Sequence, residues 1–161
     1  MQSINPEHIK VVLDFTNRSP YYELLSKKLC ELRIGYSRVE IELQNKHMNL
    51  LNSIHGGVYS SIIDTSSYWS IYCELDENVG YISQDVCVNN LSMINKGKII
   101  AEGKSIKIGR KICTAESIVK DITGRILAHG ISKLMILSDK QSIKRAIEMM
   151  GYSTLPSKFL P

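Results

Sequence analysis

The chain has 161 residues and a mass of 18.2 kDa, the size of one ordinary domain. Hydrophobic residues make up 43% of it and charged residues 22%, which excludes a disordered protein and argues against a fibrous one. With 20 Lys and Arg residues against 16 Asp and Glu, the formal net charge is +4. This surplus is too small to identify a nucleic-acid-binding protein, although it suits a small anionic ligand.

The sequence predicts neither secretion nor a membrane span nor a metal site. Its four cysteines are widely scattered: Cys30, Cys73, Cys87 and Cys113. No pair has the two-residue spacing of a zinc or redox motif, which favours reduced core thiols. Residues 1–8 lack the regions of a secretion signal, and the longest aliphatic run, at 134–137, is too short to cross a bilayer. We therefore expect a soluble, cytoplasmic protein without a membrane or nucleic-acid partner.

The first part of the chain predicts two short helices and then a strand. Asn5 and Ser19 each precede a proline, which places a favoured N-cap residue before proline at the first helical position. Apolar residues alternate over residues 32–43, which predicts a strand. The alternation changes parity near residues 37–38, and a β-bulge there would explain the change.

One long helix is predicted near the centre of the chain. Residues 58–75 contain neither proline nor glycine and carry apolar side chains on most faces, as in a buried helix. Four strands separated by turn sequences follow, at residues 81–91, 99–108, 112–119 and 126–137. Ser138 and Gln141 then predict a capping box for a final helix, and the tail over 156–161 is expected to be extended.

Together these elements predict an α+β fold with a single domain over residues 1–161. An antiparallel sheet of about five strands would wrap around the long helix and form a core over about 32–137. Residues 1–31 would add N-terminal helices, and residues 138–161 a C-terminal helix and tail. Such a sheet exposes one long edge strand, which pairing with a second copy would cover.

Asp64 is the first candidate for a functional residue. It lies in the middle of the predicted helix among Ser, Thr, aliphatic and aromatic residues. A carboxylate in that position is costly unless hydrogen bonds or a function compensate for its burial. The structural alternative is an Asp bonded to nearby hydroxyls such as those of Ser61 and Thr65, and the residue types alone leave both interpretations open.

The glycine pair Gly56-Gly57 at the start of this helix is the second candidate. Glycines let a ligand approach the backbone, and the free N–H groups of a helix N-terminus favour negative charge, such as the oxyanion from a thioester or ester carbonyl. The alternative is a plain tight turn. Gly56 and Asp64 lie about 12 Å apart along a helix, at ~1.5 Å per residue. If both act on one carbonyl, we expect Asp64 from one subunit and Gly56 from the other.

These candidates belong to a longer motif that resembles a known family. Residues 49–57 read Asn-Leu-Leu-Asn-Ser-Ile-His-Gly-Gly, and Asp64 follows seven residues after the second glycine. The pattern is similar to that of the hotdog-fold acyl-CoA thioesterases of the phenylacetate-degradation (PaaI-like) family. The resemblance covers roughly residues 32–137, and it implies a hotdog fold and an acyl-CoA substrate.

The resemblance also implies a role for each motif residue. Asp64 would be the general base or the nucleophile toward the thioester, and the Gly56 N–H would polarise the carbonyl oxygen across a dimer interface. Asn49 would position the water or the thioester, and Ser83 would orient the Asp64 carboxylate. Residues that bind substrate or support its binding would be His55, Gly57, Tyr68, Arg110 and Lys111.

The substrate-binding roles have simple alternatives. His55 would fix its loop by hydrogen bonding rather than take part in the chemistry. Arg110 and Lys111 would meet the phosphates of coenzyme A, but a solvated hairpin tip explains them equally well. Tyr68 would line an acyl tunnel, although the aromatic residues of a buried helix are mostly core residues.

The sequence departs from the family's pattern at two positions. Asn52 stands where the family usually has Gly, and Asn tolerates left-handed backbone better than most residues. Met93 stands where a proline usually ends the preceding strand. Neither belongs to the expected chemistry, but both bear on the shape of the pocket.

The sequence thus predicts a thioester hydrolase that uses no metal and no cofactor beyond the coenzyme A of its substrate. The resemblance implies a homodimer at least, and a homotetramer built as a dimer of dimers. One alternative is a non-catalytic acyl-CoA-binding or regulatory hotdog module, which needs no buried carboxylate. A hotdog dehydratase is a further alternative, but it expects a paired His and acid and fits the His55-Gly56-Gly57 motif poorly. The acyl group is left open, as is the choice between the two roles of Asp64.

Overall fold

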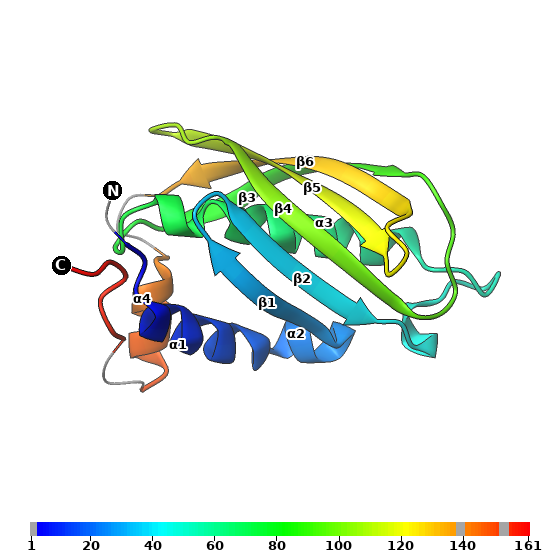
Figure 1. The fold of residues 1–161 in the computed structure, drawn as a ribbon, viewed down its shortest axis with the longest axis horizontal. Coiled ribbons are helices and arrows are strands. Elements are labelled where there is room, and N and C mark those ends of the chain that lie inside the picture. The colour runs from blue at the N-terminus through cyan, green and yellow to red at the C-terminus, as the bar shows by residue number, and fades with distance from the viewer. Residues whose placement is uncertain (1–2, 138–140, 152–154) are drawn as a thin grey trace.

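A computed structural model describes residues 3–137, 141–151 and 155–161, and its strands form one curved antiparallel sheet around a central helix (Figure 1). The strands are β1 (Lys27–Arg33), β2 (Tyr36–Glu42), β3 (Tyr81–Asn90), β4 (Lys98–Lys107), β5 (Ile112–Asp121) and β6 (Ile126–Ile136). They lie in the order β1-β2-β4-β5-β6-β3, so β1 and β3 form the edges. The α+β fold class is confirmed, with six strands in the sheet rather than about five.

Two helices precede the sheet, as predicted. In α1 (Pro6–Asn17) the Asn5 side chain accepts a hydrogen bond from the Glu7 N–H, and α2 (Pro20–Leu25) begins after Ser19. The helical segment ends earlier than expected, because Ser26 adopts left-handed backbone (φ 49°) and β1 begins at Lys27. The structure therefore contradicts the prediction of N-terminal helices up to residue 31.

The parity change within residues 32–43 comes from a hairpin. β1 and β2 are antiparallel and pair Arg33 with Tyr36, so the chain turns at residues 34–35, where Gly35 has a φ of +68°. The β-bulge expected at residues 37–38 is absent from this described segment. The register irregularity of this hairpin lies in β1 instead, between Leu29 and Glu31.

The central helix α3 (Gly56–Ser70) has 15 residues, and a 3-10 turn (Tyr72–Glu74) follows it. It therefore includes the glycine pair and ends five residues before the predicted end at residue 75. Such tightening is common at the C-terminal end of an α-helix. A second 3-10 turn (Asn45–His47) lies in the loop between β2 and α3.

The position of α3 under the sheet is set by close contacts around Ser66. Its hydroxyl lies 2.6 Å from that of Ser117 in β5, and its carbonyl accepts a hydrogen bond from Ser37 in β2. Gly103 of β4 has no side chain here, and a Cβ at this position would lie 2.1 Å from the Ser66 carbonyl oxygen. The backbone of α3 therefore approaches the sheet as closely as sterics allow, two residues from Asp64.

The C-terminal segment forms a short helix and then returns to the N-terminus. Helix α4 (Ile143–Met149) is capped by Ser142, whose side chain accepts a hydrogen bond from the Arg145 N–H. The predicted cap, Ser138, lies outside the described residues. Beyond α4, the tail is pinned where Phe159 forms an isolated β-bridge with Ile4, and the two ends of the chain lie near each other (Figure 1).

Other expectations concern cysteines, metals and membranes. Cys73 and Cys113 are buried free thiols, whereas Cys87 is exposed on β3, so not every thiol is a core residue. Among the described residues, no group of three or more His, Cys, Asp or Glu could hold a metal ion. Within these ranges, no helix is long and apolar enough to cross a membrane.

Candidate active site

Asp64 lies half-buried on α3, at a cavity of about 330 Å³ beside the N-terminal helices. Its Oδ1 oxygen is buried and has no hydrogen-bond partner among the described residues. The hydroxyls of Ser61 and Thr65 instead accept hydrogen bonds from the Lys27 ammonium, at 3.3 and 2.7 Å. The structural alternative, in which neighbouring hydroxyls hold the carboxylate, therefore leaves this oxygen unexplained.

The rest of this cavity is mostly apolar and aromatic. Its lining residues are Phe15, Thr16, Ser19, Tyr21, Tyr22, Lys27, Asp64, Thr65, Tyr68, Trp69 and Ile143. Tyr68 donates a hydrogen bond to the Tyr81 carbonyl at 3.3 Å, so one end of the ring is fixed. Burial, together with the charge of Asp64, raises the pKa of Tyr68. The lining of this cavity therefore suits a neutral, apolar group beside the carboxylate of Asp64.

Lys27 is the residue of this cavity that sequence reasoning missed. Its side chain is buried, with 3% of the residue exposed, and its ammonium lies 4.4 and 4.5 Å from the ring centroids of Tyr21 and Tyr22. Burial lowers the pKa of Lys27 to about 8, an effect that the charge of Asp64 opposes. The prediction of helices up to residue 31 hides this position, because Lys27 and Leu29 share the inward face only in a strand.

The turn His55-Gly56-Gly57 leaves one backbone N–H at the start of α3 without a partner. His55 is the N-cap, and its Nδ1 accepts a hydrogen bond from the Gly57 N–H at 2.9 Å. The Val58 N–H donates to the His55 carbonyl at 2.9 Å. The Gly56 N–H has no acceptor among the described residues, so it can donate to an anionic group at this helix end.

Asn49 organises the loop that precedes this turn. Its side-chain oxygen accepts hydrogen bonds from the N–H groups of Leu51 and Ser53, at 2.9 and 3.2 Å. Asn52 has a φ of +54°, so the residue that replaces the family's glycine does adopt left-handed backbone. The loop therefore keeps the glycine-type conformation with an Asn side chain in place.

Gly56 and Asn49 share a second cavity, of about 590 Å³. Its lining residues are Asn49, Ile54, Gly56, Tyr59, Asn90, Leu91, Ser92, Met93 and Arg125. This cavity and the one beside Asp64 have no lining residue in common. Since Gly56 and Asp64 are also about 12 Å apart along α3, a single chain does not bring these two residues to one point.

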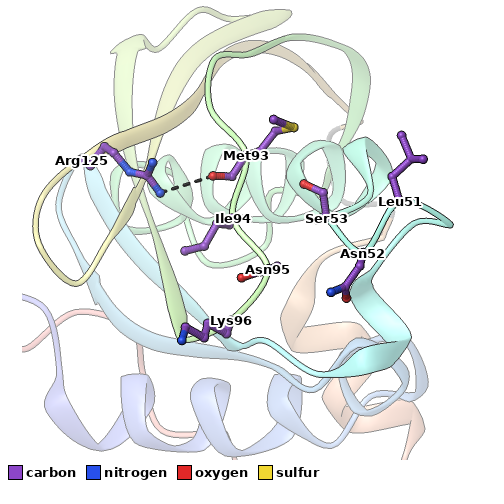
Figure 2. A pocket seen from close by; sticks show the side chains of 8 residues that line it. All are labelled: Leu51, Asn52, Ser53, Met93, Ile94, Asn95, Lys96 and Arg125. Carbon is purple, nitrogen blue, oxygen red and sulfur yellow. Dashed lines mark hydrogen bonds between the residues drawn. The ribbon is translucent and has the colours of Figure 1, made fainter.

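A third cavity, of about 510 Å³, lies next to the second one and shares Met93 and Arg125 with it. Figure 2 shows Arg125 and Met93 on one side and the residues of the 51–53 loop on the other. Arg125 donates a hydrogen bond to the Met93 carbonyl at 3.3 Å and forms an ion pair with Asp121. The position where the family usually has proline therefore lies at the junction of two cavities.

The remaining predicted site residues lie apart from these groups. Ser83 is exposed on the edge strand β3, and within the described residues no hydrogen bond joins it to Asp64. Arg110 and Lys111 are exposed in the turn between β4 and β5. Neither lines the cavity beside Asp64 or the one beside Gly56.

Register places the β4–β5 turn at the opposite end of the sheet from Gly56. The Ile136 N–H donates to the Lys111 carbonyl, and Ile136 pairs with Tyr81 at the start of β3. Gly56 lies beside Asn90 at the other end of β3, because a Cβ on Gly56 would be 2.9 Å from the Asn90 amide nitrogen. The ten residues of β3 separate the two sites by about 30 Å, at ~3.3 Å per residue.

Known proteins support the interpretation of this architecture. No protein-family model matches the chain. A putative esterase of Archaeoglobus fulgidus is 25% identical over 113 residues, which cover 66% of this chain and 68% of that protein. Human acyl-coenzyme A thioesterase 13 is 22% identical over 133 residues, which cover 81% of this chain and 94% of the human protein.

Solved structures show the same fold. A thioesterase from Haemophilus influenzae matches with a TM-score of 0.73 at 16% identity, covering 80% of this chain and 90% of that chain. A variant of the phenylacetic acid degradation protein PaaI from Thermus thermophilus matches with a TM-score of 0.66 at 18% identity, covering 73% and 98% of the two chains.

A curved antiparallel sheet around one central helix is the hotdog fold. The chain has this fold, and its sequence is similar to those of a putative esterase and of an acyl-coenzyme A thioesterase. The hotdog fold that the resemblance implies is confirmed, and the roles of individual residues remain predictions.

Proposed function

We propose that the protein is an acyl-CoA thioesterase of the PaaI-like type, which hydrolyses a thioester to a free acid and coenzyme A. The observation that carries this proposal is the buried, unpartnered Oδ1 of Asp64 at a largely apolar cavity. The free Gly56 N–H supplies the complementary group, a donor for an oxyanion. The names of the similar proteins, a human acyl-CoA thioesterase among them, favour the same reaction.

The residues divide the chemistry between a base and an oxyanion donor. Asp64 takes the proton of a water that attacks the thioester carbonyl, or it attacks the carbonyl itself to form an anhydride that water then opens. In both routes the Gly56 N–H donates to the carbonyl oxygen as it becomes negative. Cleavage of the C–S bond releases the coenzyme A thiolate, which takes up a proton, together with the acid.

The active unit in this proposal is a dimer. Because Asp64 and Gly56 open into separate cavities of one chain, one thioester meets both only if Gly56 comes from the partner subunit. The edge strand β3 offers the pairing surface, since Val86 on β3 and Ile131 on its neighbour β6 are partly exposed. The other edge, β1, is contacted by both N-terminal helices.

Antiparallel pairing through β3 would also bring the coenzyme A contacts together. A two-fold axis sets the Asn90 end of one β3 beside the Tyr81 end of the other. Arg110 and Lys111 would then lie near Gly56 of the partner subunit, about 30 Å from Gly56 of their own chain. In this arrangement the two cations meet the phosphates of the coenzyme A whose thioester lies at that interface.

The test is thiol release from a panel of aryl-, short- and long-chain acyl-CoAs. Asp64→Asn should remove most of the turnover while the oligomer, measured by light scattering, stays intact. Asp14→Asn is the matched control, because Asp14 is exposed on α1 and ion-paired with Arg18, away from the proposed interface. Near-normal turnover by Asp64→Asn would reject the assignment. Tight binding of acyl-CoA by the wild type without hydrolysis would instead identify a non-catalytic binding module.

A further inference from the structure

Lys27 is a buried cation whose position the proposed function does not yet explain. Its ammonium donates to the hydroxyls of Thr65 and Ser61 at 2.7 and 3.3 Å. Among the described residues, no carboxylate lies within ion-pair distance of it. A buried ammonium without a direct ion pair is costly, so its presence at a cavity needs a compensating role.

The charge opposite Lys27 is that of Asp64. Thr65 follows Asp64 in the chain, and Ser61 lies one helical turn before it, so the two hydroxyls that hold the ammonium flank the carboxylate on α3. Lys27 and Asp64 are the cationic and the anionic residue of the same 330 Å³ cavity. Because Lys27 is buried and the lining is mostly apolar, the attraction between the charges is less screened than it would be at an exposed surface.

Helix α2 closes the other side of the ammonium. The ring centroids of Tyr21 and Tyr22 lie 4.4 and 4.5 Å from Lys27 Nζ. The quadrupole of an aromatic ring attracts a cation at this distance, so both rings stabilise the charged ammonium. Tyr22 also accepts a hydrogen bond from Trp69 of α3 at 2.7 Å, so its ring is held in place. The N-terminal helices therefore fix the lysine against α3.

We propose that Lys27 is a positioning residue, whose buried ammonium holds a positive charge beside Asp64 and so keeps that carboxylate ionised and ready to act. This inference rests on the proposed function, because it assigns Lys27 a part in the reaction of Asp64. It also gives the N-terminal helices, which lie outside the motif, a role in the active site.

The other titratable groups around this pair are tyrosines. Tyr21 and Tyr22 come from α2, Tyr68 from α3 and Tyr81 from β3. Burial raises the pKa values of Tyr22, Tyr68 and Tyr81, so these phenols stay neutral at the pH values of the test. The residues of α1 and α4 that line the cavity, Phe15, Thr16 and Ile143, do not titrate. Asp64 and Lys27 are thus the charged residues of this pocket.

The experiment compares Lys27→Met with Lys27→Arg and measures kcat and KM between pH 4.5 and pH 8.5. An opposite charge nearby lowers a carboxyl pKa by about 1 to 3 pH units, so Lys27→Met should move the acid limb of kcat upward by at least about one unit. Well below the limb each unit of upward shift lowers kcat about tenfold, so the loss in kcat should grow toward pH 4.5, and at pH 8 it should be within about threefold. Lys27→Arg should restore the limb, and KM should stay unchanged.

The matched control is Lys28→Met, since Lys28 is the exposed neighbour on the same strand and should leave the profile unchanged. An equal loss at pH 5 and pH 8 would mean that Lys27 has a purely structural role and would overturn the proposal. So would a rise in KM at constant kcat, which would make Lys27 a substrate contact.

A second measurement separates this inference from the proposed function. The carboxyl carbon of Asp64 is titrated by NMR in the free protein, with its signal assigned by comparison with Asp64→Asn. A higher Asp64 pKa in Lys27→Met supports the electrostatic link, and an unchanged pKa rejects it. If the wild type hydrolyses no acyl-CoA, the proposed function fails, and with it the role in the reaction, whatever the titration shows.

Discussion

His55 Nδ1 accepts a hydrogen bond from the Gly57 N–H at 2.9 Å, and this contact begins the central helix. We expect His55→Ala to destabilise the protein by about 1 kcal/mol, because one N–H of the first turn loses its acceptor. His55→Asn should recover most of this stability, since Asn is a favoured N-cap residue. Thermal unfolding followed by circular dichroism measures both. A loss of turnover in His55→Asn without a loss of stability would instead indicate that the imidazole acts in the chemistry.

Gly56→Pro should remove the oxyanion donor while the helix still forms. Gly56 is the first helical residue, a position where proline is favoured and needs no N–H, and His55 already has extended backbone (φ −72°, ψ 134°). We expect kcat to fall by about 10²- to 10³-fold, as for the loss of one oxyanion donor. Gly56→Ala is the control, because it adds a Cβ against the same Asn90 amide but keeps the N–H.

Two inactive variants should complement each other if Gly56 and Asp64 act across an interface. In a mixed dimer of Asp64→Asn and Gly56→Pro chains, one of the two sites combines an intact Asp64 with an intact Gly56 of the partner subunit. Subunit exchange at equal concentrations should therefore restore about a quarter of the wild-type activity, given random pairing. No recovery after demonstrated exchange would place both groups within one chain.

Gly103→Ala should disrupt the contact between the sheet and the helix. The added Cβ would lie 2.1 Å from the Ser66 carbonyl oxygen, where both partners are backbone and cannot rotate away. We expect a loss of at least about 2 kcal/mol in the free energy of unfolding, measured with urea. Lys104→Ala, at the exposed neighbouring position, should change it little.

The buried Lys158 should make stability depend on alkaline pH. Burial lowers the pKa of its ammonium from 10.5 to about 8 in the folded protein, while the side chain donates to the Leu75 carbonyl. Between these pH values the unfolded chain binds the extra proton, so this residue makes the folded state more stable as the pH rises. Its contribution is up to about 1 kcal/mol per pH unit. Urea unfolding at pH 7.5 and pH 9.5 measures this gain in the free energy of unfolding. The gain should be larger in the wild type than in Lys158→Met, and it should be the same in the wild type and in the exposed control Lys10→Met.

Much of the fold could be predicted because periodicity and turn residues report it directly. The last four strands and the central helix follow from alternation and from a long stretch without proline or glycine. The β1–β2 hairpin was missed because Gly35 is a single weak turn signal and leucine spacing near residue 29 suits a helix as well as a strand. The end of the helix at Ser70 also has no strong signal in the sequence.

The site could be predicted only where a local motif carries it. The sequence spacing of the motif predicts the turn at His55 and the position of Asp64 on the helix that follows it. The same spacing predicts the distance between Gly56 and Asp64 along that helix. The proximity of Lys27 to Asp64 depends on the packing of β1 and α2 against α3, which links residues 37 positions apart in the chain. Such a contact is a tertiary property that no local pattern encodes.

The bridge between Ile4 and Phe159 has a practical consequence for engineering the chain. It holds the first and last described segments of the chain, at Ile4 and Phe159, next to each other. A short flexible linker should therefore join the segment near Ile4 to the segment near Phe159, and new ends could be opened at an exposed turn such as the one at residues 122–124. A circularly permuted protein of this kind would keep every strand of the sheet intact.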